Sequence, residues 1–119
     1  MKDKQTTDKR KDVSTMKTYN YRLYCGLNDK DTKKQEIPTE EAQNVFNGLV
    51  ARMFDGATVW TADGVYTHVD GTQVSEKTLC CELVFTDGVK VKKFCNQLKE
   101  VFNQESIAVQ AIEVEADLW

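Results

Sequence analysis

The chain has 119 residues, of which 40% are apolar and 29% are charged, and its formal net charge is −3. A chain of this length forms one domain and buries a sizeable core without needing a disulfide or metal staple. Its apolar runs are only a few residues long, which excludes a membrane-spanning helix, so we expect a cytoplasmic protein that makes no membrane contact.

Charge is distributed unevenly along the chain. Residues 1–17 contain six Lys or Arg and three Asp, whereas residues 18–119 contain ten Lys or Arg and sixteen Asp or Glu. We expect residues 1–16 to be a disordered basic extension and residues 17–119 to form a single α+β domain. An acidic domain is poorly suited to a phosphate backbone, so we expect no direct nucleic-acid binding. It suits a protein partner with a basic, nucleic-acid-binding surface, and the alternative is an ordinary acidic composition without such a role.

The first strand and the first helix are predicted by hydrophobic periodicity. Apolar side chains alternate over residues 19–27, and Gly26 permits a bulge or the close approach of another group. A helix is predicted to begin with Thr39 as its N-cap and to end at a left-handed Gly56. Its apolar stripe consists of Ala42, Val45, Phe46, Leu49, Val50, Met53 and Phe54.

The middle of the chain is predicted to be β-structure. Strands are indicated at 57–62, 65–69 and 78–86, and the pairs Asp63–Gly64 and Asp70–Gly71 are typical of turns or bulges. We therefore expect an elaborated hairpin between the second and third strands, with an extra hairpin inside it.

A second helix and a last strand complete the pattern. Asp87 is predicted to cap the helix and Asn103 to close it. The helix stripe consists of Val91, Phe94, Cys95, Leu98, Val101 and Phe102. The apolar side chains of the strand at 107–115 change phase midway. Either a bulge or burial of both faces against a partner would explain this change.

This order of elements predicts a ferredoxin-like βαββαβ sandwich, with an antiparallel sheet and two helices on one face. Right-handed crossovers give the strand order 4-1-3-2. The open face or an exposed edge strand is a natural place for a partner or a homodimer contact. The open face is expected to carry Asn20, Arg22, Tyr24, Cys80, Glu82 and Val84.

Candidate catalytic and metal-binding groups are few. The four cysteines lack C-x-x-C spacing and are interpreted as buried thiols in preference to metal ligands or disulfides; they are Cys25, Cys80, Cys81 and Cys95. Cys25 with His68, the single histidine, is the alternative nucleophile and base. Residues 28–31 lack the glycine and terminal glutamate of a calcium-binding loop. We therefore expect no enzyme activity, no metal and no cofactor.

Two groups of residues are candidates for partner binding. Aromatic side chains near the predicted hairpin are suited to recognition, and they are equally suited to a core. An acidic segment with a terminal aromatic anchor is the second candidate, and the solvated side of an edge strand is its alternative. The candidate residues are Trp60, Tyr66, His68, Glu113, Glu115, Asp117 and Trp119.

The segments 21–31, 54–59 and 70–72, read as YRLYCGLNDKD, FDGATV and DGT, resemble small uncharacterised proteins of bacterial mobile elements and prophages. The resemblance covers residues 17–115. It implies a ferredoxin-like fold and an accessory gene, and it carries over no active-site residue.

These observations favour a non-catalytic interaction protein. Its proposed role is inhibition of a host defence nuclease, in the manner of an anti-CRISPR protein, with the acidic surface occupying a basic DNA channel. The alternative is a dimeric protein that binds a small molecule or nucleotide between the sheet and the hairpin at 60–68.

Overall fold

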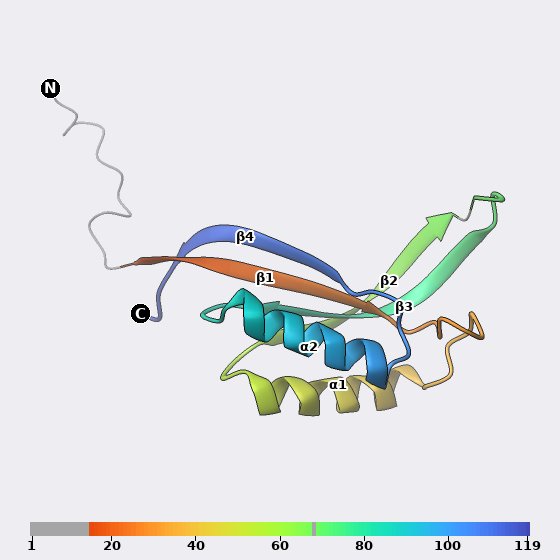
Figure 1. Cartoon of the computed structure of the whole chain (residues 1–119), viewed down its shortest axis with the longest axis horizontal. Coiled ribbons are helices and arrows are strands. Elements are labelled where there is room, and N and C mark those ends of the chain that lie inside the picture. Colours follow the sequence, from red (N-terminus) through yellow and green to blue (C-terminus); the bar gives the residue numbers. More distant parts are fainter. Residues whose placement is uncertain (1–14, 68) are drawn as a thin grey trace, which may run out of the picture.

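The computed structural model describes residues 15–67 and 69–119. The elements follow the order β-α-β-β-α-β (Figure 1). Their bounds are β1 Met16–Gly26, α1 Thr39–Met53, β2 Thr58–Thr67, β3 Gln73–Leu83, α2 Gly88–Val101 and β4 Ala108–Ala116. Residues 1–14 and His68, on which two of the sequence predictions fall, lie outside the described residues.

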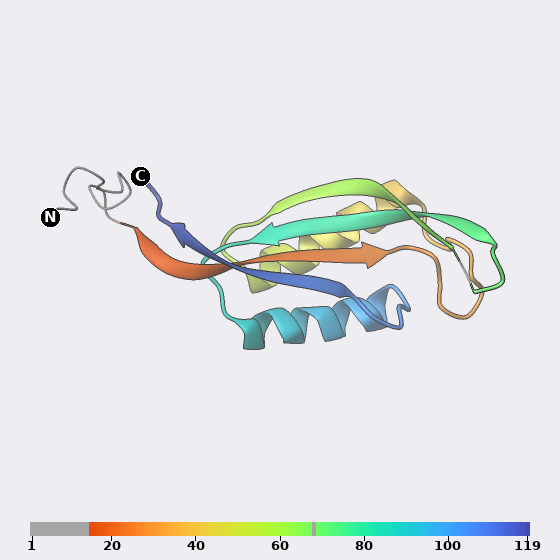
Figure 2. The ribbon, with the colours of Figure 1, turned by 90° about the horizontal axis from the view of Figure 1, so that it is seen from above.

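The four strands form one antiparallel sheet in the order β2-β3-β1-β4. Figure 2 shows β2 at one edge and β4 at the other, and Figure 1 shows both helices on the same side of the sheet. The ferredoxin-like architecture and the predicted strand order are therefore confirmed. No helix in the described ranges is long and apolar enough to cross a membrane.

The core lies between the helices and one face of the sheet. Phe46 of α1 and Phe94 of α2 meet edge to face, with ring centroids 5.8 Å apart. Phe54 also meets Phe94 edge to face, with ring centroids 5.2 Å apart. The strands supply Leu23, Cys25, Leu79, Cys81 and Leu83 to this core. These are alternate positions of β1 and β3, so the remaining positions face away from the helices.

The helix ends agree only in part with the prediction. Asp87 caps α2, because its Oδ1 accepts a 2.8 Å hydrogen bond from the Lys90 backbone nitrogen. Asn103 follows the end of α2 in the left-handed region, with φ 47°. The N-cap of α1 is Pro38, and Thr39 is already helical. The prediction of a left-handed cap at Gly56 was wrong, because α1 is capped by Phe54 in an extended conformation.

The β2–β3 hairpin is longer and simpler than predicted. Asp63 and Gly64 lie inside β2, paired with Lys77 and Glu76 of β3, so there is no extra hairpin among the described residues. The continuous ladder of strand pairs stabilises the extended chain at this site against the local turn preference. Strand β3 begins at Gln73, five residues earlier than the predicted strand at 78–86.

Strand β4 pairs with β1 in an unbroken register from Ala108 to Ala116, which rules out the predicted bulge. Its apolar side chains therefore remain on both faces. Val109 is 45% exposed on the helix side, and Ile112 is 42% exposed on the open side. Burial of both faces against a partner, the second explanation for the phase change, stays a prediction.

Candidate functional site

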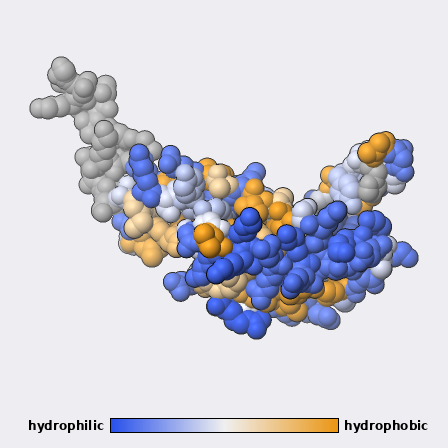
Figure 3. Space-filling view, viewed as in Figure 1, coloured by the Kyte–Doolittle hydropathy of each residue, from blue (hydrophilic) through white to orange (hydrophobic). Residues whose placement is uncertain are grey.

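The open face of the sheet carries polar and aromatic side chains. At one end of it a pocket of about 480 Å³ lies between β1, the β2–β3 hairpin and the turn from α2 to β4. Figure 3 shows the surface hollowed where the hairpin projects from the body. Side chains from all three regions line this space, which we call the Glu76 pocket; they include Tyr24, Asn28, Lys30, Tyr66, Glu76 and Glu105.

Glu76 lies between two strands that each carry a glycine beside it. Gly64 of β2 is its direct partner in the register. On the other side, a Cβ built on Gly26 would lie 2.5 Å from the Glu76 carboxyl carbon and both its oxygens. Any other residue at Gly26 would therefore force the carboxylate to move. Glycines inside strands often mark the close approach of another group, and here that group is a carboxylate.

A backbone amide fixes the direction of this carboxylate. The Asn28 nitrogen donates a 2.8 Å hydrogen bond to Glu76 Oε2, and the Asn28 carbonyl accepts a 2.7 Å hydrogen bond from Gln104 Nε2. Hydrogen bonds to an ionised acceptor are stronger than neutral ones. The loop that follows β1 therefore holds the Glu76 carboxylate, and the turn after α2 holds that loop.

The loop after β1 is organised by its own carboxylates. Asn103 Nδ2 donates to Asp29 Oδ2 and to Asp31 Oδ2, at 2.9 Å each. These hydrogen bonds are the main reason that the pKa values of Asp29 and Asp31 are lowered. The two carboxylates therefore fasten the loop. Within the described residues there is no group of three or more His, Cys, Asp or Glu side chains that could hold a metal ion.

Aromatic rings stand on the same face as Glu76. Tyr24 and Tyr66 line the pocket, and the Tyr24 hydroxyl donates a 3.4 Å hydrogen bond to Gln110 Oε1. Trp60 and Tyr24 flank Cys80 in the register, and Cys80 is fully buried there, although neither α1 nor α2 covers this face. The face therefore offers flat apolar surfaces next to a fixed negative charge.

A family model described as "Protein of unknown function (DUF3574)" matches residues 20–117. The chain belongs to this family. The match includes every residue named above as lining the Glu76 pocket. None of the curated proteins searched is similar to the DUF3574 chain at a significant level.

Solved structures of a phage SAM lyase share the fold of the DUF3574 chain. The lyase in complex with S-methyl-5′-thioadenosine has a TM-score of 0.57 and 22% identity, over 85% of this chain and 92% of the lyase. The lyase in its apo state has a TM-score of 0.58 and 21% identity, over 87% of this chain and 93% of the lyase.

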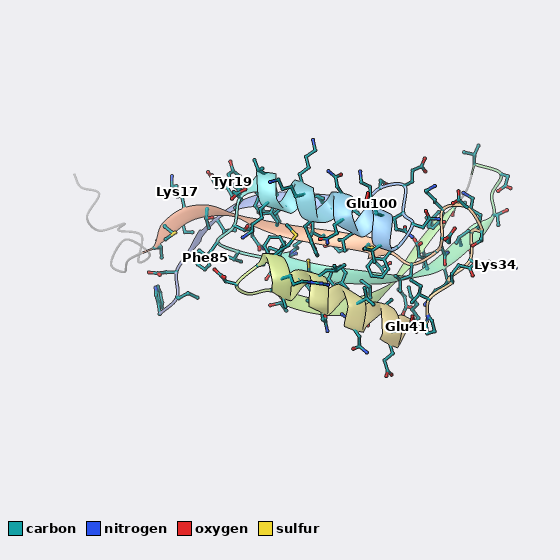
Figure 4. The ribbon with its side chains drawn as sticks, turned by 60° about the horizontal axis from the view of Figure 1, so that its bottom comes forward. Lys17, Tyr19, Lys34, Glu41, Phe85 and Glu100 are labelled. Atoms are coloured by element: carbon teal, nitrogen blue, oxygen red, sulfur yellow. The ribbon has the colours of Figure 1, made fainter. Side chains whose placement is uncertain are left out.

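A second pocket, of about 600 Å³, lies at the other end of the sheet and includes Phe85 among its lining residues. Figure 4 labels Phe85 near one end of the molecule and Lys34, in the loop after β1, near the other. On the open face between the ends, Glu82 Oε2 accepts hydrogen bonds from Asn20 Nδ2 at 3.0 Å and Arg22 Nε at 2.9 Å. Both bonds lower the pKa of Glu82.

The structure does not bring the predicted partner-binding residues together. Trp60 and Tyr66 share the open face, and Tyr66 lines the Glu76 pocket. The acidic segment lies at the opposite end of the sheet. Glu113 and Glu115 pair with Tyr19 and Lys17 of β1, Asp117 lines the second pocket, and Trp119 is 86% exposed. Whether any of these residues binds a partner stays a prediction.

Cys25 is not placed for nucleophilic chemistry. Its side chain is fully buried in the core, on the helix side of β1. Burial is the main cause that raises the pKa of its thiol to about 12, with a smaller contribution from the negative charge of Glu76. A thiolate at this position is therefore strongly disfavoured at neutral pH.

Sequence reasoning missed Glu76, the central residue of the pocket. The predicted third strand began at 78, so Glu76 lay outside the predicted strands, and the Asp63–Gly64 pair was interpreted as a turn or bulge. The usable signal was Gly26, where the predicted close approach of another group is confirmed. The chain alone did not show which group approaches.

Proposed function

We propose that this DUF3574 protein binds S-adenosylmethionine and S-methyl-5′-thioadenosine in the Glu76 pocket and cleaves the former to the latter. The observation that carries the proposal is the Glu76 carboxylate, fixed by the Asn28 amide beside two tyrosine rings on an open sheet face. The shared fold with a phage SAM lyase supports the choice of ligand.

The chemistry of the pocket suits a cationic nucleoside. The sulfur of S-adenosylmethionine is a positively charged sulfonium, which a carboxylate and the faces of aromatic rings both stabilise. Asn28 and Gln104 line the same space. Gln104 Nε2 already donates to the Asn28 and Phe102 carbonyls, so the Gln104 amide oxygen and the Asn28 side-chain amide are the groups that suit the hydrogen-bonding edge of adenine. A volume of about 480 Å³ is within the usual range for a small-molecule site.

Cleavage by a lyase needs little help from an acid. The bond between the sulfonium sulfur and the γ-carbon of the methionine part breaks, and its electron pair leaves with sulfur as a neutral thioether. In the same step, either the fragment's own carboxylate oxygen bonds to the γ-carbon, or a base removes a β-proton and a double bond forms between the β- and γ-carbons. In both routes we assign Glu76 to hold the sulfonium group, and in the second it is also the base.

The test uses the full chain with S-adenosylmethionine and follows release of S-methyl-5′-thioadenosine by liquid chromatography. A lactone identifies the first route and an unsaturated amino acid the second. Glu76→Gln keeps the size of the side chain and removes its charge, and we expect it to weaken S-adenosylmethionine binding about tenfold or more. Glu100→Gln on α2 is the matched control.

Binding is measured separately from turnover by calorimetry and by thermal shift, since a ligand of the folded state raises the melting temperature. Binding without product would support the nucleoside site and reject cleavage. If neither S-adenosylmethionine nor S-methyl-5′-thioadenosine binds at millimolar concentration, the proposal is wrong.

A second candidate function is inhibition of a host defence nuclease through an acidic surface. The observation that favours it is the position of Glu113 and Glu115 on the edge strand β4, where both residues are exposed. Such a strand can meet a basic partner without rearrangement of the core. Pull-down of candidate nucleases at low and high salt tests it, with Glu113→Lys as the variant expected to abolish capture.

A further inference from the structure

Glu76 is connected to the end of α2 by a continuous series of contacts. Asn28 donates to the carboxylate, Gln104 holds the Asn28 carbonyl, and Asn103 precedes Gln104 in the turn. The Lys30 backbone nitrogen donates a 3.0 Å hydrogen bond to the Asn103 carbonyl. The loop after β1 is therefore joined to this turn by one backbone–backbone hydrogen bond and by one from the Gln104 side chain.

Asn103 has an orientation that the helix end imposes. Its φ of 47° lies in the left-handed region, which asparagine tolerates better than most residues. The Gln104 nitrogen donates a 2.9 Å hydrogen bond to the Lys99 carbonyl, which closes the last turn of α2. The Asn103 side-chain amide is therefore aimed at the loop by the backbone of the helix.

The Asn103 amide joins two side chains that would otherwise repel each other. Its nitrogen donates to both Asp29 and Asp31, and the charge of Asp29 acts to raise the pKa of Asp31. Asp29 Oδ1 also accepts hydrogen bonds from the backbone nitrogens of Asp31 and Thr32, at 2.8 Å and 3.0 Å. Removal of the amide leaves two carboxylates without their shared donor next to Asn28.

We infer that Asn103 is a positioning residue for the Glu76 pocket: it fixes the loop that carries the Asn28 amide, and through that amide it sets the direction of the Glu76 carboxylate. The effect on ligand binding rests on the proposed function. The effect on the Asn28–Glu76 hydrogen bond does not, because it belongs to the free protein.

The direct test is the amide resonance of Asn28 in nitrogen–proton correlation spectra of the free protein. Glu76→Gln removes the charge of the acceptor and defines the shift that marks a weakened hydrogen bond. Asn103→Gly keeps the left-handed backbone and removes only the side-chain amide, and it is expected to move the Asn28 resonance in the same direction. Asp87→Ala weakens the other end of α2 and controls for general loss of stability, with no shift expected at Asn28.

The second test is the affinity for S-adenosylmethionine. We expect Asn103→Gly to weaken binding about tenfold, and the double variant with Glu76→Gln to bind no more weakly than Glu76→Gln alone, because both changes act through one carboxylate. Additive losses would contradict the inference, and so would an Asn28 resonance that stays in place in Asn103→Gly. A shifted resonance in a protein that binds no S-adenosylmethionine would support the positioning role and overturn only the proposed function.

Discussion

The Glu76 carboxylate occupies the space that a side chain at Gly26 would fill. A Cβ on Gly26 would approach the Glu76 carboxyl carbon and oxygens to 2.5 Å, and Gly26 has an ordinary extended backbone with no positive φ. Glycine is therefore required here by the neighbouring carboxylate, while the backbone conformation itself would accept any residue.

Gly26→Ala is expected to abolish S-adenosylmethionine binding with little loss of stability. The new methyl group meets the far end of a flexible side chain, so Glu76 swings away, and the free energy of unfolding changes by less than about 1 kcal/mol. Calorimetric titration and denaturant unfolding measure the two effects. Gly56→Ala is the control, because nothing lies within 4 Å of its new Cβ. Unchanged binding in Gly26→Ala would show that the carboxylate position is unimportant.

The loop after β1 is expected to loosen in acid. Hydrogen bonds, first of all from Asn103, lower the pKa of Asp29 and Asp31 in the folded state. A lowered folded-state pKa contributes stability that is present above the unfolded value of about 3.9 and is lost as the pH falls through the folded value. Hydrogen exchange of the Asp31 and Thr32 amides, compared between about pH 5 and pH 2.5, should show faster opening in acid. The same comparison in Asn103→Gly should show a smaller pH dependence.

All four cysteines are expected to be unreactive in the native protein. They are free and buried, and burial raises the pKa of each thiol, to about 12 for Cys25 and Cys81. With an aromatic disulfide reagent at pH 8, the native protein should therefore release no coloured thiolate, and the absorbance should rise only after denaturant is added. Cys25→Ser should keep S-adenosylmethionine binding if it folds. Rapid labelling of one thiol in the native state would contradict this prediction and identify a reactive cysteine.

The contact between the two helices is expected to dominate stability. Phe94 is fully buried and meets both Phe46 and Phe54, so Phe94→Ala should lower the free energy of unfolding by about 3–5 kcal/mol. Phe85→Ala is the comparison. Because Phe85 is 42% exposed, its replacement should lower the free energy of unfolding much less. Urea denaturation of both variants measures the difference, and equal losses would contradict the placement of the core.

The fold could be predicted because its signals are local. The alternation along β1 and the apolar stripes of α1 and α2 each identify one buried face, and two single-faced helices need one sheet face to cover them. The cap at Asp87 and the end of the second helix near Asn103 were likewise predicted from a few neighbouring residues. The Asp63–Gly64 pair shows the limit, since its local turn preference is overridden by pairing with β3.

The candidate site was decided by the tertiary structure. Glu76 meets Asn28 across 48 positions of sequence, and Asn103 meets Asp29 across 74. Such contacts depend on strand register and on the path of the turn after α2, and neither leaves a periodic signal in the chain. The sequence by itself therefore determined which faces are buried, because burial follows local periodicity. Only the folded chain determined which carboxylate faces the pocket, because that depends on which distant backbone comes close enough to hold it.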